Sequence, residues 1–118
     1  MAKASEYPLY EHWYKTLNWI LDRCDGMPKH TRFTVSGRIA QLSVEVAEWI
    51  TDAIYTRDRQ PILSAVNKNL EKLRLYFRLC KDRHYISIHQ YEFISKEINQ
   101  AGVMCGGWMK NTKNHAQD

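Results

Sequence analysis

The stretch that decides the fold spans residues 63–80 and reads LSAVNKNLEKLRLYFRLC. Its apolar side chains recur every three or four residues, which is the spacing that places them along one side of an α-helix. The residues on this stripe are Leu63, Val66, Leu70, Leu73, Phe77 and Cys80. Leu75 and Leu79 lie one turn apart on nearly the opposite side. The stretch is therefore predicted to form a helix that is apolar on two sides.

Three interruptions divide the chain into four helical stretches, of which this helix is the third. Gly26 and Pro28 end one helical pattern, Asp58 and Pro61 are suited to the N-cap and first turn of another, and the segment from Ser87 to Gln90 reads as a capping box. We expect helices over about residues 8–24, 34–57, 61–84 and 87–110, followed by a flexible tail over residues 111–118.

Each of the other predicted helices also carries an amphipathic stripe. The stripes are Trp13, Leu17, Ile20 and Leu21; then Ile39, Leu42, Val46, Trp49, Ile50 and Ala53; then Tyr91, Ile94, Ile98, Ala101, Cys105 and Trp108. Short loops favour antiparallel neighbours. The sequence predicts one all-α domain over residues 1–118, an antiparallel up-down-up-down four-helix bundle. We interpret Gly102, Gly106 and Gly107 as sites of close helix approach.

Several functional classes are excluded by composition and motif. The cysteines, Cys24, Cys80 and Cys105, are odd in number and form no CxxC pair, which argues against a disulfide framework and a zinc knuckle. There is no Glu-x-x-His pair for a di-iron centre and no cluster of aspartates that would hold polymerase metals. No stretch approaches the ~20 apolar residues of a membrane span. We expect a cytoplasmic protein with no cofactor, no metal and no enzymatic activity.

The predicted helix over residues 61–84 also carries the densest basic cluster. Arg74 and Arg78 lie one turn apart, and Lys81 follows on the same flank. Guanidinium groups in such a row suit phosphate oxygens. The candidate nucleic-acid-binding residues are Arg74, Arg78, Lys81, Lys72, Lys68 and Arg38. The alternative is that these arginines pair with glutamates of neighbouring helices, and the sequence weighs the two interpretations about equally.

The second apolar side of this helix indicates a partner surface. A single bundle has one interior, so it does not bury Leu75 and Leu79 as well as the core stripe. We therefore expect these leucines, joined by Tyr76, to form a subunit interface in a homo-oligomer. The alternative is a pair of exposed leucines, which are common singly on protein surfaces.

Several segments together resemble a known bacterial family of four-helix bundles. They are RFTVSGRI at residues 32–39, IYTRDR at 54–59, NKNLEKLRLYFRL at 67–79, QYE at 90–92 and GGWMK at 106–110. In this order and spacing the chain resembles Avd, the accessory variability determinant family of diversity-generating retroelements, from about residue 10 to residue 110. A related branch is encoded in intervening sequences of large-subunit ribosomal RNA genes.

The resemblance implies a specific assembly and role. Members form a homopentameric ring with a positive surface, bind the retroelement's reverse transcriptase and its template RNA, and are required for mutagenic complementary-DNA synthesis. The basic pair of the family's third helix corresponds to Arg74 and Arg78. We therefore expect a non-enzymatic accessory subunit. The alternative is a structural protein-interaction bundle of the ribosomal-RNA intervening-sequence branch, without a retroelement role.

Overall fold

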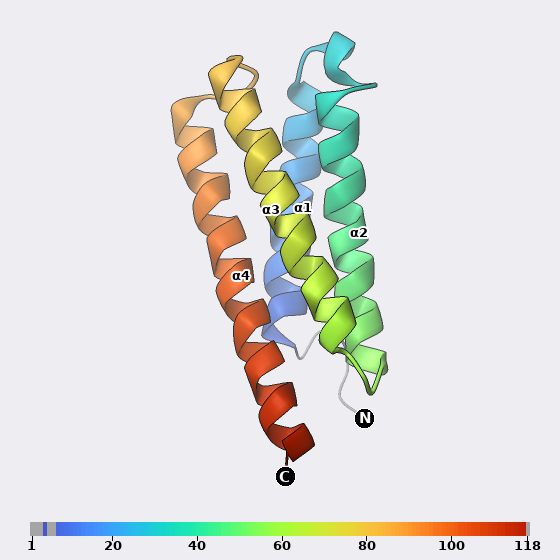
Figure 1. The fold of residues 1–118 in the computed structure, drawn as a ribbon. Coiled ribbons are helices and arrows are strands. Elements are labelled where there is room, and N and C mark those ends of the chain that lie inside the picture. Colours follow the sequence, from blue (N-terminus) through green and yellow to red (C-terminus); the bar gives the residue numbers. More distant parts are fainter. Residues whose placement is uncertain (1–3, 5–6, 118) are drawn as a thin grey trace.

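The computed structural model describes residue 4 and residues 7–117, with side chains described as far as residue 112. Its four long helices are α1 (Pro8–Gly26), α2 (Val35–Tyr55), α3 (Gln60–Asp82) and α4 (Ile88–Gln117), and a short 3₁₀ helix, η2 (Lys29–Thr31), precedes α2. Successive long helices run in opposite directions (Figure 1). The described residues contain no strand. The predicted all-α four-helix bundle is therefore confirmed.

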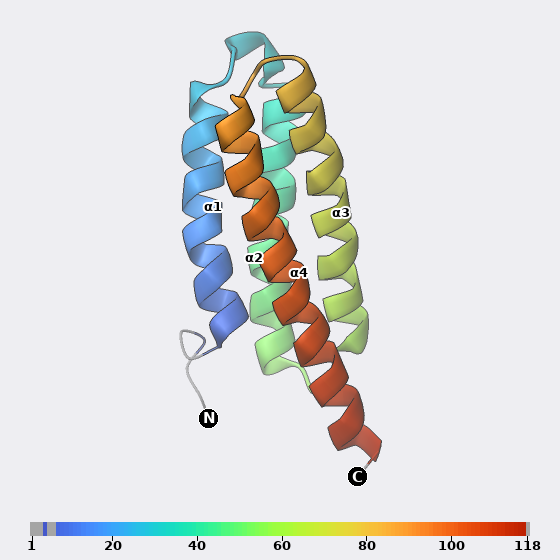
Figure 2. The same ribbon diagram turned by 90° about the vertical axis from the view of Figure 1, so that its left-hand side faces the viewer.

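The helices form a four-cornered arrangement around one core. Helix α2 packs against both α1 and α3, and α4 packs against the same two helices. The loops after α1 and α3 therefore lie together at one end of the bundle, while α4 projects beyond the other end (Figure 2). The chain extends 50 × 21 × 20 Å, so its long sides and its ends are separate surfaces.

The core follows the apolar stripe of α3 as predicted. Leu63, Val66, Leu70, Leu73, Phe77 and Cys80 are all buried. The indole of Trp13 is also buried, and its Nε1 donates to the carbonyl oxygen of Ser43 at 2.9 Å, so its polar group is satisfied inside the core. Trp49 was expected in the core but is 37% exposed. It stands about 100° around α2 from Ile50, which places its ring at the rim of the core.

Local hydrogen bonds close the C-terminal end of α3 and the N-terminal end of α4. His84 has φ 62°, and Tyr85 N donates to the carbonyl of Cys80 at 2.8 Å, which closes α3 in a Schellman motif. The predicted capping box at α4 is confirmed: Ser87 N donates to Gln90 Oε1, and Gln90 N donates to Ser87 Oγ.

At the start of α3 the outcome differs from the sequence prediction. Pro61 lies in the first turn as expected, because a proline there removes no helical hydrogen bond. The N-cap, however, is Arg59 and not Asp58, and no side chain caps the helix. The carbonyl of Arg59 accepts from Leu63 N at 2.9 Å, so the turn begins one residue later than the aspartate would place it.

Helix α4 is longer than predicted and its glycines differ from expectation. The backbone remains helical to Gln117, past the predicted end at residue 110 and through part of the segment expected to be a flexible tail. Only Gly102 lies close to a neighbouring helix, with Arg74 Nη2 3.3 Å from the position of a Cβ. A Cβ on Gly106 or Gly107 would meet nothing within 4 Å, so the expected close approach at those two glycines is wrong.

Candidate nucleic-acid interface

The cations of α3 lie on both flanks of the helix. Arg74 and Lys81 turn toward α4: Arg74 Nε donates to Asn99 Oδ1 at 3.2 Å, and Lys81 Nζ lies 4.6 Å from the ring centroid of Tyr91. At about 100° per residue, Lys72 lies on the flank nearer α2, and Lys68 points outward between the directions of Leu75 and Leu79. The cluster seen in the sequence is therefore not one continuous row.

Arg74 has protein partners, and this bears on the alternative of intramolecular pairing. Its guanidinium forms an ion pair with Glu71 on the same helix as well as the hydrogen bond to Asn99. Arg78 is exposed and forms no ion pair with a residue that the structure describes. Pairing therefore accounts for Arg74, whereas Arg78 presents its charge to solvent and is the freer group for a phosphate.

The two exposed leucines of α3 separate these basic flanks. Leu75 is 64% exposed and Leu79 is 37% exposed, on the side of α3 that faces away from the core. We call this pair the α3 ridge. Tyr76 does not belong to it, because its ring is half-buried against the core and lines a hollow beside α2. That all three residues form a subunit interface stays a prediction.

Arg38 lies in this hollow, at some distance around the bundle from the α4-facing cations. Its Nη1 donates to Gln41 Oε1 at 3.2 Å, and Gln41 Nε2 donates onward to Glu45 Oε1 at 3.3 Å. The hollow has a volume of about 540 Å³. It is lined by Arg32, Phe33, Thr34, Val35, Gly37, Arg38, Gln41 and Tyr76. We call it the Phe33 hollow.

A further group of polar side chains lies at this end of the bundle, and the sequence did not predict that its members meet. Arg83 Nε donates to the phenol oxygen of Tyr85 at 2.8 Å, and this hydrogen bond raises the pKa of the arginine above its ordinary value. His30 Nε2 lies 3.4 Å from the same oxygen. Since Arg83 and His30 belong to loops far apart in sequence, no local pattern indicated that they meet.

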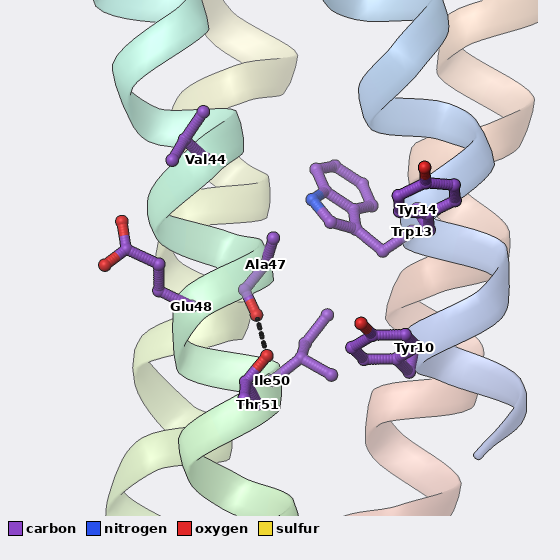
Figure 3. A pocket seen from close by; sticks show the side chains of 8 residues that line it. All are labelled: Tyr10, Trp13, Tyr14, Val44, Ala47, Glu48, Ile50 and Thr51. Carbon is purple, nitrogen blue, oxygen red and sulfur yellow. Dashed lines mark hydrogen bonds between the residues drawn. The ribbon is translucent and has the colours of Figure 1, made fainter. Parts of the chain in front are cut away.

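On a long side of the bundle, α1 and α2 enclose a small apolar notch, shown in Figure 3. The side chains of Tyr10, Trp13 and Tyr14 on α1 face those of α2 across it. The notch has a volume of about 160 Å³, and its α2 side is formed by Val44, Ala47, Glu48, Ile50 and Thr51. The described lining residues include one acidic group, Glu48, and no basic group. We call it the α1/α2 notch.

The cysteines are poor nucleophiles and poor metal ligands in this fold. Burial raises the pKa of the Cys24 thiol to about 12, and burial raises those of Cys80 and Cys105 to about 11. The thiols are therefore protonated at neutral pH, and it is the thiolate that attacks electrophiles and binds metals.

Among the described residues, no three histidine, cysteine or acidic side chains gather as a metal site requires. None of the helices that the structure describes combines the length and the hydropathy of a membrane span.

Comparison with known proteins agrees with the resemblance seen in the sequence. The model of the bAvd-like family matches residues 9–112, a span that holds α1, α2, α3 and most of α4. No curated protein matches the chain. The match covers the α3 cations, the α3 ridge and the α1/α2 notch, and it confirms the resemblance to Avd-type proteins. This chain belongs to the bAvd-like family.

Proposed function

We propose that this protein is a non-enzymatic, cytoplasmic accessory subunit of a diversity-generating retroelement. In this role it binds the reverse transcriptase and the template RNA and supports mutagenic complementary-DNA synthesis. The observation that carries the proposal is the bAvd-like match over residues 9–112, since this is a family of accessory proteins and not a known enzyme family. Membership also implies association with a reverse transcriptase in general.

Charge supports an RNA-binding role for the α3 side of the bundle. The chain carries Lys+Arg 17 against Asp+Glu 13, and α3 has cations on both flanks of its ridge. Lysine and arginine that contact phosphates release condensed counterions, which makes the affinity depend on salt and very little on base identity. Arg78 and Lys68 are exposed and suited to this contact. Arg74, Lys81 and Arg38 already have partners within the protein, so they would contribute by reorienting toward phosphate.

The α3 ridge and the α1/α2 notch support assembly into a closed homo-oligomer, which we take to be a pentamer. A ring requires two different complementary surfaces on each subunit, because each copy contacts the next head to tail. The α3 ridge is apolar with Lys72 beside it, whereas the α1/α2 notch is apolar with Glu48 at its rim. The α3 ridge of one copy therefore matches the α1/α2 notch of the next in both polarity and charge.

A reconstituted reaction tests the accessory role directly. Purified reverse transcriptase and its template RNA are incubated with and without this protein, and the products are quantified and sequenced. We expect this protein alone to make no complementary DNA, and its addition to change the yield, start site or error pattern of the polymerase. Identical products in both arms would reject the accessory role.

The binding partners are tested separately by co-purification. Tagged protein should capture both the reverse transcriptase and the template RNA encoded beside it, and the RNA should be lost at high salt before the polymerase. The family match does not favour the alternative of a structural bundle from the ribosomal-RNA intervening-sequence branch. Such a bundle would capture protein without RNA and leave the polymerase reaction unchanged.

A further inference from the structure

Phe33 is the most exposed large apolar side chain of the described residues. It is 93% exposed, more than Val103 at 69% or Leu75 at 64%. Burying a phenylalanine side chain is favourable, so a ring in this position forgoes that stabilisation in the free protein. An aromatic ring held in solvent at the rim of a hollow is a surface that a ligand can cover.

The turn that carries Phe33 is held by hydrogen bonds on both sides of it. Arg32 N donates to the carbonyl of Lys29 at 3.2 Å, and Thr34 N donates to the carbonyl of Thr31 at 3.0 Å. The Thr31 hydroxyl donates to the carbonyl of Pro28 at 2.6 Å and is itself buried. The ring is therefore presented by an ordered turn, so the turn itself loses little conformational entropy when a ligand binds.

A glycine further constrains this turn. The carbonyl of Arg32 lies against Gly37 on the first turn of α2, in the position where any other residue would place its Cβ. This contact joins the turn to α2, so that Phe33 stands at a fixed place relative to Arg38.

The charge around Phe33 has a single sign. Arg32 and Arg38 both line the Phe33 hollow, and none of the described residues that line it is acidic. Neither arginine forms an ion pair with a described residue. Glu45 accepts a hydrogen bond from Gln41 but is not among the lining residues. The hollow therefore combines an open aromatic face with two cations and suits a ligand that is both planar and anionic.

We propose that the Phe33 hollow binds an unpaired nucleotide of single-stranded RNA, with the nucleobase stacked on Phe33 and the flanking phosphates on Arg32 and Arg38. The inference rests on the proposed RNA-binding function and assigns part of it to a site away from α3. Single strands are recognised by aromatic side chains that stack on exposed bases within a positive groove. A double helix keeps its bases stacked inside, so this site distinguishes single strands from duplexes.

A protein segment is the competing occupant, and the charge argues against it. Arginine and aromatic residues are also enriched at protein interfaces, so the argument rests on the single sign of the charge and not on the residue types. Here two arginines flank one phenylalanine without an acidic neighbour, which matches a phosphodiester backbone better than an apolar peptide.

The test compares Phe33→Ala with the wild-type protein on two probes. These are a fluorescein-labelled 20-nucleotide single-stranded RNA and the same RNA annealed to its complement, measured by fluorescence anisotropy over a salt series. We expect Phe33→Ala to weaken single-strand binding about tenfold, because base–aromatic stacking is lost. Duplex affinity and the salt slope should stay unchanged, because no cation is removed. Phe33→Trp should retain single-strand affinity.

Two controls separate the possible outcomes. Tyr55→Ala removes another exposed aromatic ring, 58% exposed at the C-terminal end of α2, and should leave both affinities unchanged. Thermal unfolding of Phe33→Ala should match the wild type, since the ring is in solvent.

Equal weakening on both probes, or no weakening, would overturn the assignment while leaving the RNA-binding role intact. Unchanged RNA affinity with loss of reverse-transcriptase capture, or of oligomer mass, would assign Phe33 to a protein contact and also overturn it. If the wild type binds neither probe, both the inference and the proposed RNA-binding function fail.

Discussion

Gly37 and the carbonyl of Arg32 lie so close together that a Cβ at position 37 would overlap the carbonyl oxygen. Gly37 is in the first turn of α2, and its φ is not positive. It is therefore required for space and not for backbone conformation. Through this contact the loop after η2 folds back onto α2 and places Arg32 and Phe33 at the bundle end.

Substituting Gly37 is expected to destabilise the protein. Gly37→Ala should lower the free energy of unfolding by about 1–3 kcal/mol, because a methyl group is forced against backbone atoms that do not yield cheaply. The control is Gly26→Ala at the end of α1, where a Cβ meets nothing within 4 Å, and it should be neutral or mildly stabilising. Urea denaturation of both variants measures the difference. Equal stabilities would contradict the close contact.

The turn between α3 and α4 contains a residue whose replacement should stabilise the fold. His84 adopts φ 62°, a conformation that costs an L-residue about 1 kcal/mol relative to glycine. His84→Gly should therefore raise the free energy of unfolding by about 1 kcal/mol. His84→Val should lower it by a similar amount or more, because β-branched residues tolerate this region least. If both variants shifted stability in the same direction, the left-handed turn would not be the cause.

The two arginines of α3 should differ in their effect on RNA binding. Arg78→Ala should weaken binding and flatten the log–log salt dependence by about one unit, because it removes an exposed phosphate contact. Arg74→Ala should have a smaller effect, since its guanidinium is already bonded to Glu71 and Asn99. The double variant should weaken binding further without unfolding the bundle. Lys15→Ala, which removes one exposed charge from α1, is the control for net charge.

An unchanged affinity and slope in the Arg74→Ala, Arg78→Ala double variant would show that neither arginine contacts the RNA phosphates. If polymerase capture disappears together with RNA binding, the basic side of α3 belongs to the protein interface.

The ring is tested by placing a charge on the α3 ridge. Leu75→Glu should dissociate the oligomer and bring the mass from light scattering toward the 14.0 kDa protomer. Val103→Glu, on an equally exposed apolar residue of α4, should leave the mass unchanged. A wild-type mass already near one protomer would contradict the ring.

A charge exchange tests the proposed pairing of the α3 ridge with the α1/α2 notch. Glu48→Lys and Lys72→Glu should each weaken assembly, because each brings like charges together across the interface. The two substitutions combined should restore assembly in part. If the double variant is no better than the worse single variant, these residues do not face each other.

Much of the fold follows from local pattern. The spacing of the apolar residues from Leu63 to Cys80 predicted that they are buried, and they are. This was possible because the period of a helix alone determines which residues share a face. The capping box at Ser87 depends on residues three apart and was likewise predictable. The helix end near residue 110 was misjudged because the polar segment after it has no apolar stripe, yet the backbone remains helical to Gln117.

The candidate sites depended on contacts between distant segments. The sequence by itself determined that the third helix is basic and apolar on two sides. It did not determine that Arg74 is bonded to Asn99, that Tyr76 packs against the core, or that Phe33 stands exposed. Helical periodicity reports the angle of a side chain around its own helix. What lies opposite that side chain is set by the packing of the neighbouring helix, and only the tertiary structure contains that information.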